Sequence, residues 1–157
     1  ESHPTLIGWK SIKNEKFSDQ NDSDLFHKDS RRFEIATSCI PLMAGLRRSL
    51  KLLNNEGTIE DRLEKIKQSS FILWKEMSSM NNIGTLLKEA PPTGIISFTL
   101  KNKISHDQAV KILGEKKISI RSIFQPNCLR ACLHVISTKN DITNLIKNLK
   151  EIIAIES

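Results

Sequence analysis

The chain has 157 residues, a length that holds one compact domain or one domain with an arm. Hydrophobic residues make up 38% and charged residues 27%, which excludes a disordered or fibrous chain, and no apolar run approaches the roughly 20 residues of a membrane-spanning helix. A net charge of +6 permits a polyanionic partner, but the few aromatic residues are not interleaved with basic ones, so we expect neither a nucleic-acid nor a membrane partner.

The first part of the chain, residues 1–37, is predicted to be an arm. The stretch Asn14–Asp24 is polar and turn-rich, and it has neither the helical nor the strand period. Aperiodic chain of this length ahead of a patterned segment is typical of a lead-in from another domain. We therefore expect residues 38–157 to be the small C-terminal domain of a larger protein whose first domain is missing.

Two consecutive amphipathic helices are predicted next. The first begins at Ile40, with Pro41 in the first turn where proline is tolerated, and ends before Gly57. The segment Thr58–Asp61 resembles a capping box that opens the second helix. The apolar stripe of this second helix fits either a coiled-coil dimer or packing against a sheet. Packing is favoured because the stripe lasts only about three heptads and includes Ser70.

The rest of the chain alternates short strands with helices. Strands are predicted at residues 83–87, 95–100, 118–123 and 128–136. Capping boxes at Ser105 and Thr138 open two further helices. The last helix has one apolar face, made by Ile142, Leu145, Ile146, Leu149 and Ile152. This order indicates an α+β fold: a small antiparallel or mixed sheet with helices packed on one face, preceded by the arm and the helix pair.

The strand predicted at residues 128–136 carries the candidate site. Alternation places its apolar residues toward the helices and Arg130, Cys132 and His134 on the other face. Arg121, on the preceding predicted strand, is expected on this second face as well. Two guanidinium groups offer planar forks of donors that suit a carboxylate or a phosphate. The alternative is that this face is only exposed to solvent.

Cysteine usage predicts neither a disulfide set nor a metal site. The chain has three cysteines and no secretory signal at its first residues, so we expect reduced thiols and a cytoplasmic protein. No C-x-x-C pair is present, and zinc is therefore not expected. A Cys132 nucleophile with His134 as its base would lack an orienting carboxylate.

Several short motifs occur together in one order and spacing. Gly8–Trp9 is followed by Arg31–Glu34, then Thr37, then Pro41 at the start of a helix. The later motifs are Thr93–Phe98, Ile118–Arg121, Cys128–Cys132 and Ser137–Thr138. Together they resemble the class V aminotransferase-fold family of pyridoxal-phosphate enzymes, which includes cysteine desulfurases and cysteine or cystine C–S lyases. The resemblance covers nearly the whole chain.

The resemblance implies the small domain of a homodimeric pyridoxal 5′-phosphate enzyme. In the family, the arginine at the place of Arg130 holds the substrate α-carboxylate, and the one matching Arg121 lies at the active-site edge. The threonine matching Thr37 reaches the cofactor phosphate of the other subunit, although here Ala36 replaces the usual glycine before it. The family's Schiff-base lysine lies upstream of these motifs, so we expect this fragment alone to hold no cofactor and to catalyse nothing.

The resemblance also implies a reaction. Desulfurases carry their nucleophilic cysteine between the two arginine strands, whereas the loop Ser122–Asn127 has no cysteine. This is similar to the lyase subgroup, which cleaves the C–S bond of cysteine or cystine by β-elimination. The alternatives are a cysteine desulfurase or aminotransferase of the same family and, in a different class, a free-standing basic α+β binding module.

Overall fold

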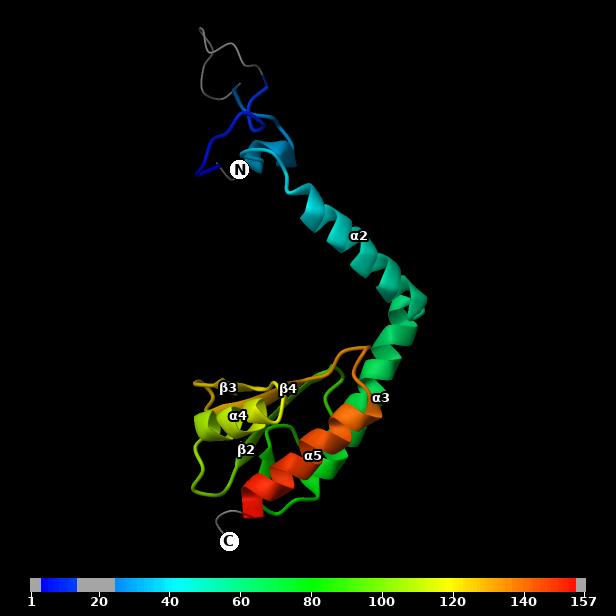
Figure 1. The fold of residues 1–157 in the computed structure, drawn as a ribbon, viewed down its shortest axis with the longest axis vertical. Coiled ribbons are helices and arrows are strands. Elements are labelled where there is room, and N and C mark those ends of the chain that lie inside the picture. The colour runs from blue at the N-terminus through cyan, green and yellow to red at the C-terminus, as the bar shows by residue number, and fades with distance from the viewer. Residues whose placement is uncertain (1–3, 14–24, 155–157) are drawn as a thin grey trace. The chain divides into compact units, whose positions relative to one another are not determined.

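The computed structural model describes residues 4–13 and 25–154 of the chain (Figure 1). The chain divides into two compact units, Glu1–Lys51 and Leu52–Ser157. The predicted polar loop Asn14–Asp24 lies outside the described residues. The boundary predicted at residue 37, between the arm and the small domain, stays a prediction about the larger protein.

Local hydrogen bonds organise the first unit. The buried Ser11 hydroxyl donates to the Gly8 carbonyl at 2.6 Å and accepts from the Gly8 amide at 2.9 Å, which fixes a turn. A 3-10 helix, η1 (Ser30–Phe33), begins where the Asp29 carboxylate accepts a 3.0 Å hydrogen bond from the Arg31 amide. The predicted arm therefore contains defined turns, although it contributes little core.

Helix α2 (Ile40–Asn55) begins at the predicted residue and has no buried side chain. Its apolar stripe is open to solvent, with Leu42 72% and Leu46 56% exposed. The chain leaves the helix through Gly57, whose φ of 100° is a conformation that favours glycine. The Arg62 guanidinium then donates to the Leu53 carbonyl at 2.8 Å, which satisfies one of the free carbonyls at the helix end.

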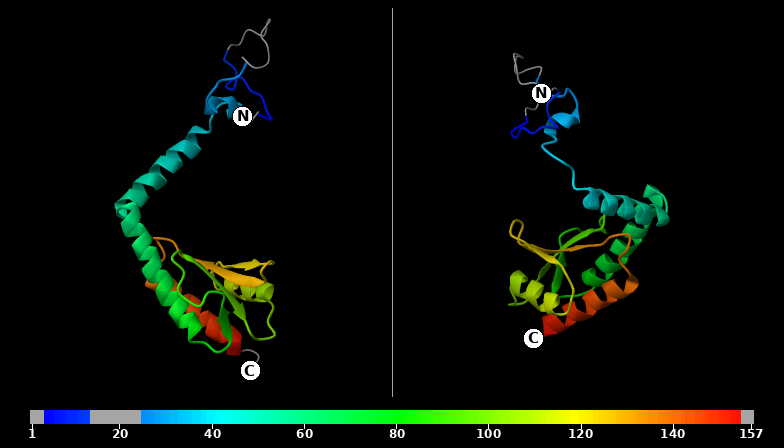
Figure 2. Two further views of the ribbon diagram at one scale, coloured as in Figure 1. Left: turned by 180° about the vertical axis from the view of Figure 1, so that it is seen from behind. Right: turned by 45° about the horizontal axis from the view of Figure 1, so that its top comes forward.

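Helix α3 (Ile59–Ser78) opens with the predicted capping box, in which Thr58 and Asp61 exchange hydrogen bonds. Its C-terminal half is buried through Ser70, Leu73 and Met77, and it packs against β1 (Ile83–Thr85) and α5 (Lys139–Ala154). Packing of α3 against the sheet is therefore confirmed. Figures 1 and 2 show α5 running alongside α3 within the second unit.

The sheet has four antiparallel strands in the order β1-β2-β4-β3. Strand β2 (Ile95–Leu100) matches its predicted bounds, and β1, β3 (Arg121–Ile123) and β4 (Cys128–Cys132) are shorter than predicted. Ahead of β3, the Ile118 amide bonds to the Leu113 carbonyl at 2.9 Å and closes the turn after helix α4 (His106–Glu115). After β4, the Ser137 amide donates to the His134 carbonyl at 2.9 Å, so the chain turns toward α5 instead of continuing the strand.

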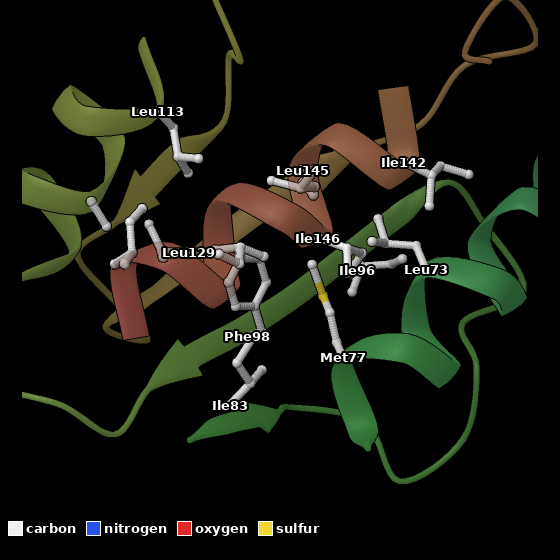
Figure 3. Packing of buried hydrophobic residues seen from close by; sticks show 14 residues of the cluster. Leu73, Met77, Ile83, Ile96, Phe98, Leu113, Leu129, Ile142, Leu145 and Ile146 are labelled. Carbon is white, nitrogen blue, oxygen red and sulfur yellow. The ribbon is translucent and has the colours of Figure 1, made fainter. Parts of the chain in front are cut away.

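One face of this sheet is covered by α3, α4 and α5, which confirms the α+β arrangement. Phe98 and Leu129 on the strands have no exposed surface (Figure 3). The five apolar residues predicted for the last helix are all buried. The capping boxes at Ser105 and Thr138 form as predicted. In the part of the chain that the structure describes, no helix is long and apolar enough to cross a membrane.

Candidate functional site

The face of the sheet opposite the helices carries a transverse row of polar side chains, the arginine row, made by Ser97, Arg130 and Arg121. In the ladder, Ser97 of β2 pairs with Arg130 of β4, and Arg130 pairs with Arg121 of β3. Paired residues of an antiparallel ladder project to the same face. The expectation that both arginines share one face is therefore confirmed.

Packing on the other face holds Arg130 in place. Its neighbours Leu129 and Ala131 point into the core with 0% and 3% of their surface exposed. Arg130 itself is half-buried, and its Nε atom is buried without a hydrogen-bond partner among the described residues. Arg121 is exposed on the edge strand β3. The guanidinium of Arg130 is therefore held in place, whereas the exposed side chain of Arg121 can change its conformation.

This arrangement suits an anion. Neither arginine makes an ion pair within the described residues, although such a pair is seen between Arg31 and Asp29 in the first unit. Two like charges directly opposite each other repel, and an oxyanion between them would remove that repulsion. A carboxylate also matches the planar fork of a guanidinium with two parallel hydrogen bonds. The arginine row can therefore bind a carboxylate or a phosphate.

Cys132 lies on the same face of the sheet as Arg130, as predicted, whereas His134 does not. Cys128 is only 2% exposed, and it lies opposite Ile123 at the closed end of the β3–β4 hairpin. Cys132 ends β4 and is exposed, and His134 lies beyond the strand in a turn where its amide bonds to the Ser137 hydroxyl at 2.9 Å. The prediction that His134 projects from the strand is wrong because the chain turns at that point. No group of residues able to hold a metal occurs among those that the structure describes.

Thr37 belongs to the first unit, between η1 and α2, and is exposed. Its surroundings link motifs that are far apart in the sequence. Lys10 Nζ donates to the Ser38 hydroxyl at 3.3 Å and lies 3.7 Å from the Glu34 carboxylate, and Gly8 packs so closely against the Ile35 backbone that a β-carbon would collide with it. The sequence did not indicate the Lys10–Ser38 contact, because nothing local marks two polar residues 28 positions apart.

Arg31, part of the same motif, is engaged within its own unit. Its guanidinium reaches Asp29 Oδ2 at 2.7 Å, and the side-chain hydrogen bond lowers the pKa of Asp29 to about 2. The Asp29 carboxylate therefore stays ionised and occupies this arginine. Arg31 is a weaker candidate for an external anion than Arg121 or Arg130.

A cavity of about 660 Å³ was not predicted from the sequence. Its lining includes His106, whose Nδ1 lies 2.8 Å from Asn127 Oδ1 and whose Nε2 accepts a hydrogen bond from the Leu100 amide at 3.4 Å. His106 therefore ties helix α4 to the end of β2 and to the β3–β4 turn. The sequence signal was present, since this histidine directly follows the predicted N-cap Ser105, but its partners are set by the tertiary fold.

The chain as a whole is similar to known proteins. Residues 1–145 match the family model described as aminotransferase class-V. Two solved structures of the enzyme C-DES are 35% identical and superpose with a TM-score of 0.83 over 93% of this chain, and one of them is the cystine C–S lyase in complex with its reaction product cysteine persulfide. The cysteine desulfurase CsdA from Escherichia coli is 18% identical, with a TM-score of 0.77 over 99% of this chain, and supports the fold.

The chain spans 37–40% of the length of these solved relatives. A comparison with curated protein sequences gives no significant match.

Proposed function

Because the chain belongs to the class V aminotransferase family, we propose that it is the small C-terminal part of a pyridoxal-phosphate lyase that cleaves the C–S bond of cysteine or cystine. The observation that carries the proposal is the pairing of Arg121 with Arg130 on the open face of the sheet. The 35% identity to C-DES, a cystine C–S lyase, supports the choice of substrate class.

Arg130 is the proposed carboxylate ligand. Its guanidinium makes no hydrogen bond among the described residues, its Nε is buried, and its backbone lies between two core residues, so its terminal nitrogens are left for a ligand and their position is restricted. Two parallel hydrogen bonds to an α-carboxylate would fix the rotation of the amino acid and thereby the direction of its Cα–H bond. Arg121 is exposed on the neighbouring strand. It would bind a second anionic group of the substrate or attract the substrate as it approaches.

The residues of this chain fit pyridoxal phosphate as partial contributors. Thr37 is exposed and makes no hydrogen bond to another described residue, so its hydroxyl is free to donate to a phosphate oxygen. In a homodimer it would serve the cofactor phosphate of the other subunit. The bound cofactor supplies an electron sink for the negative charge that develops at Cα. The remaining cofactor ligands belong to the part of the protein that this chain does not span.

The proposed reaction is a β-elimination. The Cα proton is removed, the Cβ–S bond breaks with its electron pair on sulfur, and the three-carbon enamine product takes up water to yield pyruvate and ammonia. Arg130 contributes by holding the carboxylate throughout, because a carboxylate that rotates would misalign the Cα–H bond. We place this activity in the cytoplasm, where the three cysteines of the chain stay reduced.

A desulfurase of the same family is the second candidate, and the placement of the cysteines disfavours it. A persulfide-forming nucleophile must reach the substrate as an exposed thiolate. The loop Ser122–Asn127 contains no cysteine, and Cys128, which follows it, is buried. Cys132 is exposed on the same face as Arg130 and is therefore the thiol to test.

The products distinguish the two reactions. The full-length protein with cofactor is incubated with cystine or cysteine, and pyruvate, ammonia and alanine are measured. A lyase yields pyruvate and ammonia in equal amounts, whereas a desulfurase yields alanine and leaves a persulfide on the protein. Alanine as the main product would refute the lyase proposal, and absence of any C–S cleavage would refute both.

A further inference from the structure

We propose that Ser70 and Gly94 form a clamp that positions Arg130, an inference that rests on the function proposed above. Ser70 lies on α3, on the side of the sheet that the helices cover, and Arg130 projects from the opposite face. Ser70 is thus a positioning residue that acts through the backbone between them. The connection runs from α3 to the turn Thr93–Gly94 and from that turn to the end of β4.

The first contact is a buried hydrogen bond. Ser70 has no exposed surface, and its Oγ donates to the Thr93 carbonyl at 2.7 Å. A serine within a helix commonly bonds to the carbonyl four residues earlier in its own helix, as Ser78 does with Trp74. Ser70 instead reaches 23 residues along the chain. Its place in an otherwise apolar seam is therefore explained by its bond to this turn.

The second contact excludes a side chain at residue 94. A β-carbon on Gly94 would collide with the Leu133 carbonyl and would lie 2.9 Å from Ile66 Cγ2. Ile66 and Ser70 are four residues apart, so they lie one turn apart on the same face of α3. Helix α3 thus holds the turn at two points, one polar and one apolar.

The Thr93–Gly94 turn also holds the end of β4. The Leu133 amide donates to the Gly94 carbonyl at 2.7 Å, which continues the ladder by one pair beyond Ile95 and Cys132. Arg130 lies three residues before Leu133, within this same ladder. If the pair at Gly94 and Leu133 opens, β4 frays from this end and the guanidinium of Arg130 loses its fixed position. A misplacement of about 1 Å is enough to weaken a bidentate contact many-fold.

The test separates positioning from stability. In the full-length protein, Ser70→Ala removes the donor, Ser70→Thr retains the hydroxyl, and Leu73→Ala opens a cavity in the same helix while keeping the Ser70 hydroxyl. The measurements are KM and kcat for cystine, the melting temperature, and hydrogen exchange at the Leu133 amide. We expect Ser70→Ala to raise KM by roughly 3- to 30-fold with a smaller change in kcat, and to speed exchange at Leu133.

The controls decide the outcome. Leu73→Ala is expected to lower the melting temperature at least as much while leaving KM within about 2-fold, and Ser70→Thr to recover most of the wild-type KM. Equal rises in KM for Ser70→Ala and Leu73→Ala, or unchanged exchange at Leu133 in Ser70→Ala, would overturn the clamp. If Ser70→Ala does not fold, Ser70→Cys, which is slightly larger and carries a weaker donor, takes its place in the same comparison.

A parallel Arg130→Ala variant keeps the two proposals distinct. If that variant has an unchanged KM, the proposed role of Arg130 fails, and the clamp fails with it as a device for substrate binding. If Arg130→Ala raises KM but Ser70→Ala does not, only the clamp is refuted.

Discussion

Arg121 and Arg130 face each other directly across the β3–β4 ladder, and neither has an acidic partner within the described residues. Like charges at opposed positions of a sheet repel and destabilise the fold. The sequence 121–130 forms a short hairpin around this pair, so its two strands cannot separate the charges. An anion bound between the two arginines would remove this repulsion, which explains why the fold places them opposite each other.

Replacement of the exposed arginine tests this repulsion. We expect Arg121→Gln to stabilise the 157-residue chain by about 0.2–1 kcal/mol at low ionic strength. The gain should vanish in high salt, which screens exposed charges. Urea unfolding followed by circular dichroism at two salt concentrations measures both effects. A stability loss in Arg121→Gln at low salt would show that the pair does not repel.

The two apolar stripes of the protein should respond differently to truncation. Leu149 of α5 has no exposed surface, so Leu149→Ala is expected to cost about 2–5 kcal/mol of unfolding free energy. Leu46 of α2 is 56% exposed, and Leu46→Ala should change the same free energy by less than about 0.5 kcal/mol. Chemical denaturation of the isolated chain gives both values. A large loss from Leu46→Ala would mean that the stripe of α2 is covered in solution.

Two helix caps predict an acid-dependent loss of stability. Backbone and side-chain hydrogen bonds from Thr58 and Thr138 hold the pKa of Asp61 and of Asp141 below its usual range. Because these carboxyls have a lower pKa when folded, their contribution is complete above the unfolded pKa of about 4 and is lost as the pH falls through the folded pKa. Urea midpoints between pH 6 and pH 2 should therefore fall less steeply in the Asp61→Asn, Asp141→Asn double variant. Identical slopes would contradict the prediction.

Much of the fold could be predicted because its signals are local. Capping boxes, the glycine turn and the three-four spacing of apolar residues placed each long helix, and strict alternation placed β2. The strand ends could not be predicted in the same way. Ile118–Ile120 has the residue types of a strand, but the turn closed by the bond from Ile118 to Leu113 removes it from the ladder.

The candidate site shows the same division. Alternation along single strands was enough to place Arg121 and Arg130 on one face, and the register then brought them into direct opposition. His134 was misplaced because the bonds that turn the chain at Ser137 are not a feature of strand composition. The contacts of Ser70 and Gly94 could not be foreseen, since they join a helix, a turn and a strand that are distant in the sequence.

Thiol labelling checks the placement of the cysteines that supports the lyase assignment. Cys39 and Cys132 are exposed and Cys128 is buried. In the native 157-residue chain, iodoacetamide should therefore modify Cys39 and Cys132 rapidly and Cys128 only on unfolding. Peptide mass spectrometry with and without urea assigns each site. Rapid native labelling of Cys128 would remove the burial argument against a desulfurase.

The decisive variants concern Arg130 in the full-length protein. Arg130→Ala should leave the cofactor absorbance nearly intact, because this arginine is proposed to contact the substrate. It should lower kcat/KM by roughly two to four orders of magnitude, since truncation of a charge-assisted bidentate contact in a desolvated site costs about 3–5 kcal/mol.

Three further variants show whether the loss of activity in Arg130→Ala comes from the lost bidentate contact and whether a cysteine takes part in the reaction. Arg130→Lys keeps the charge but loses the planar fork, so it should recover only part of the activity. Cys128→Ala and Cys132→Ala should remain active, because a lyase needs no thiol nucleophile for the elimination step. An inactive Cys132→Ala protein with normal cofactor absorbance would favour the desulfurase reaction instead. An Arg130→Ala protein with unchanged kcat/KM would refute the arginine row as the substrate site, whatever the products of the reaction are.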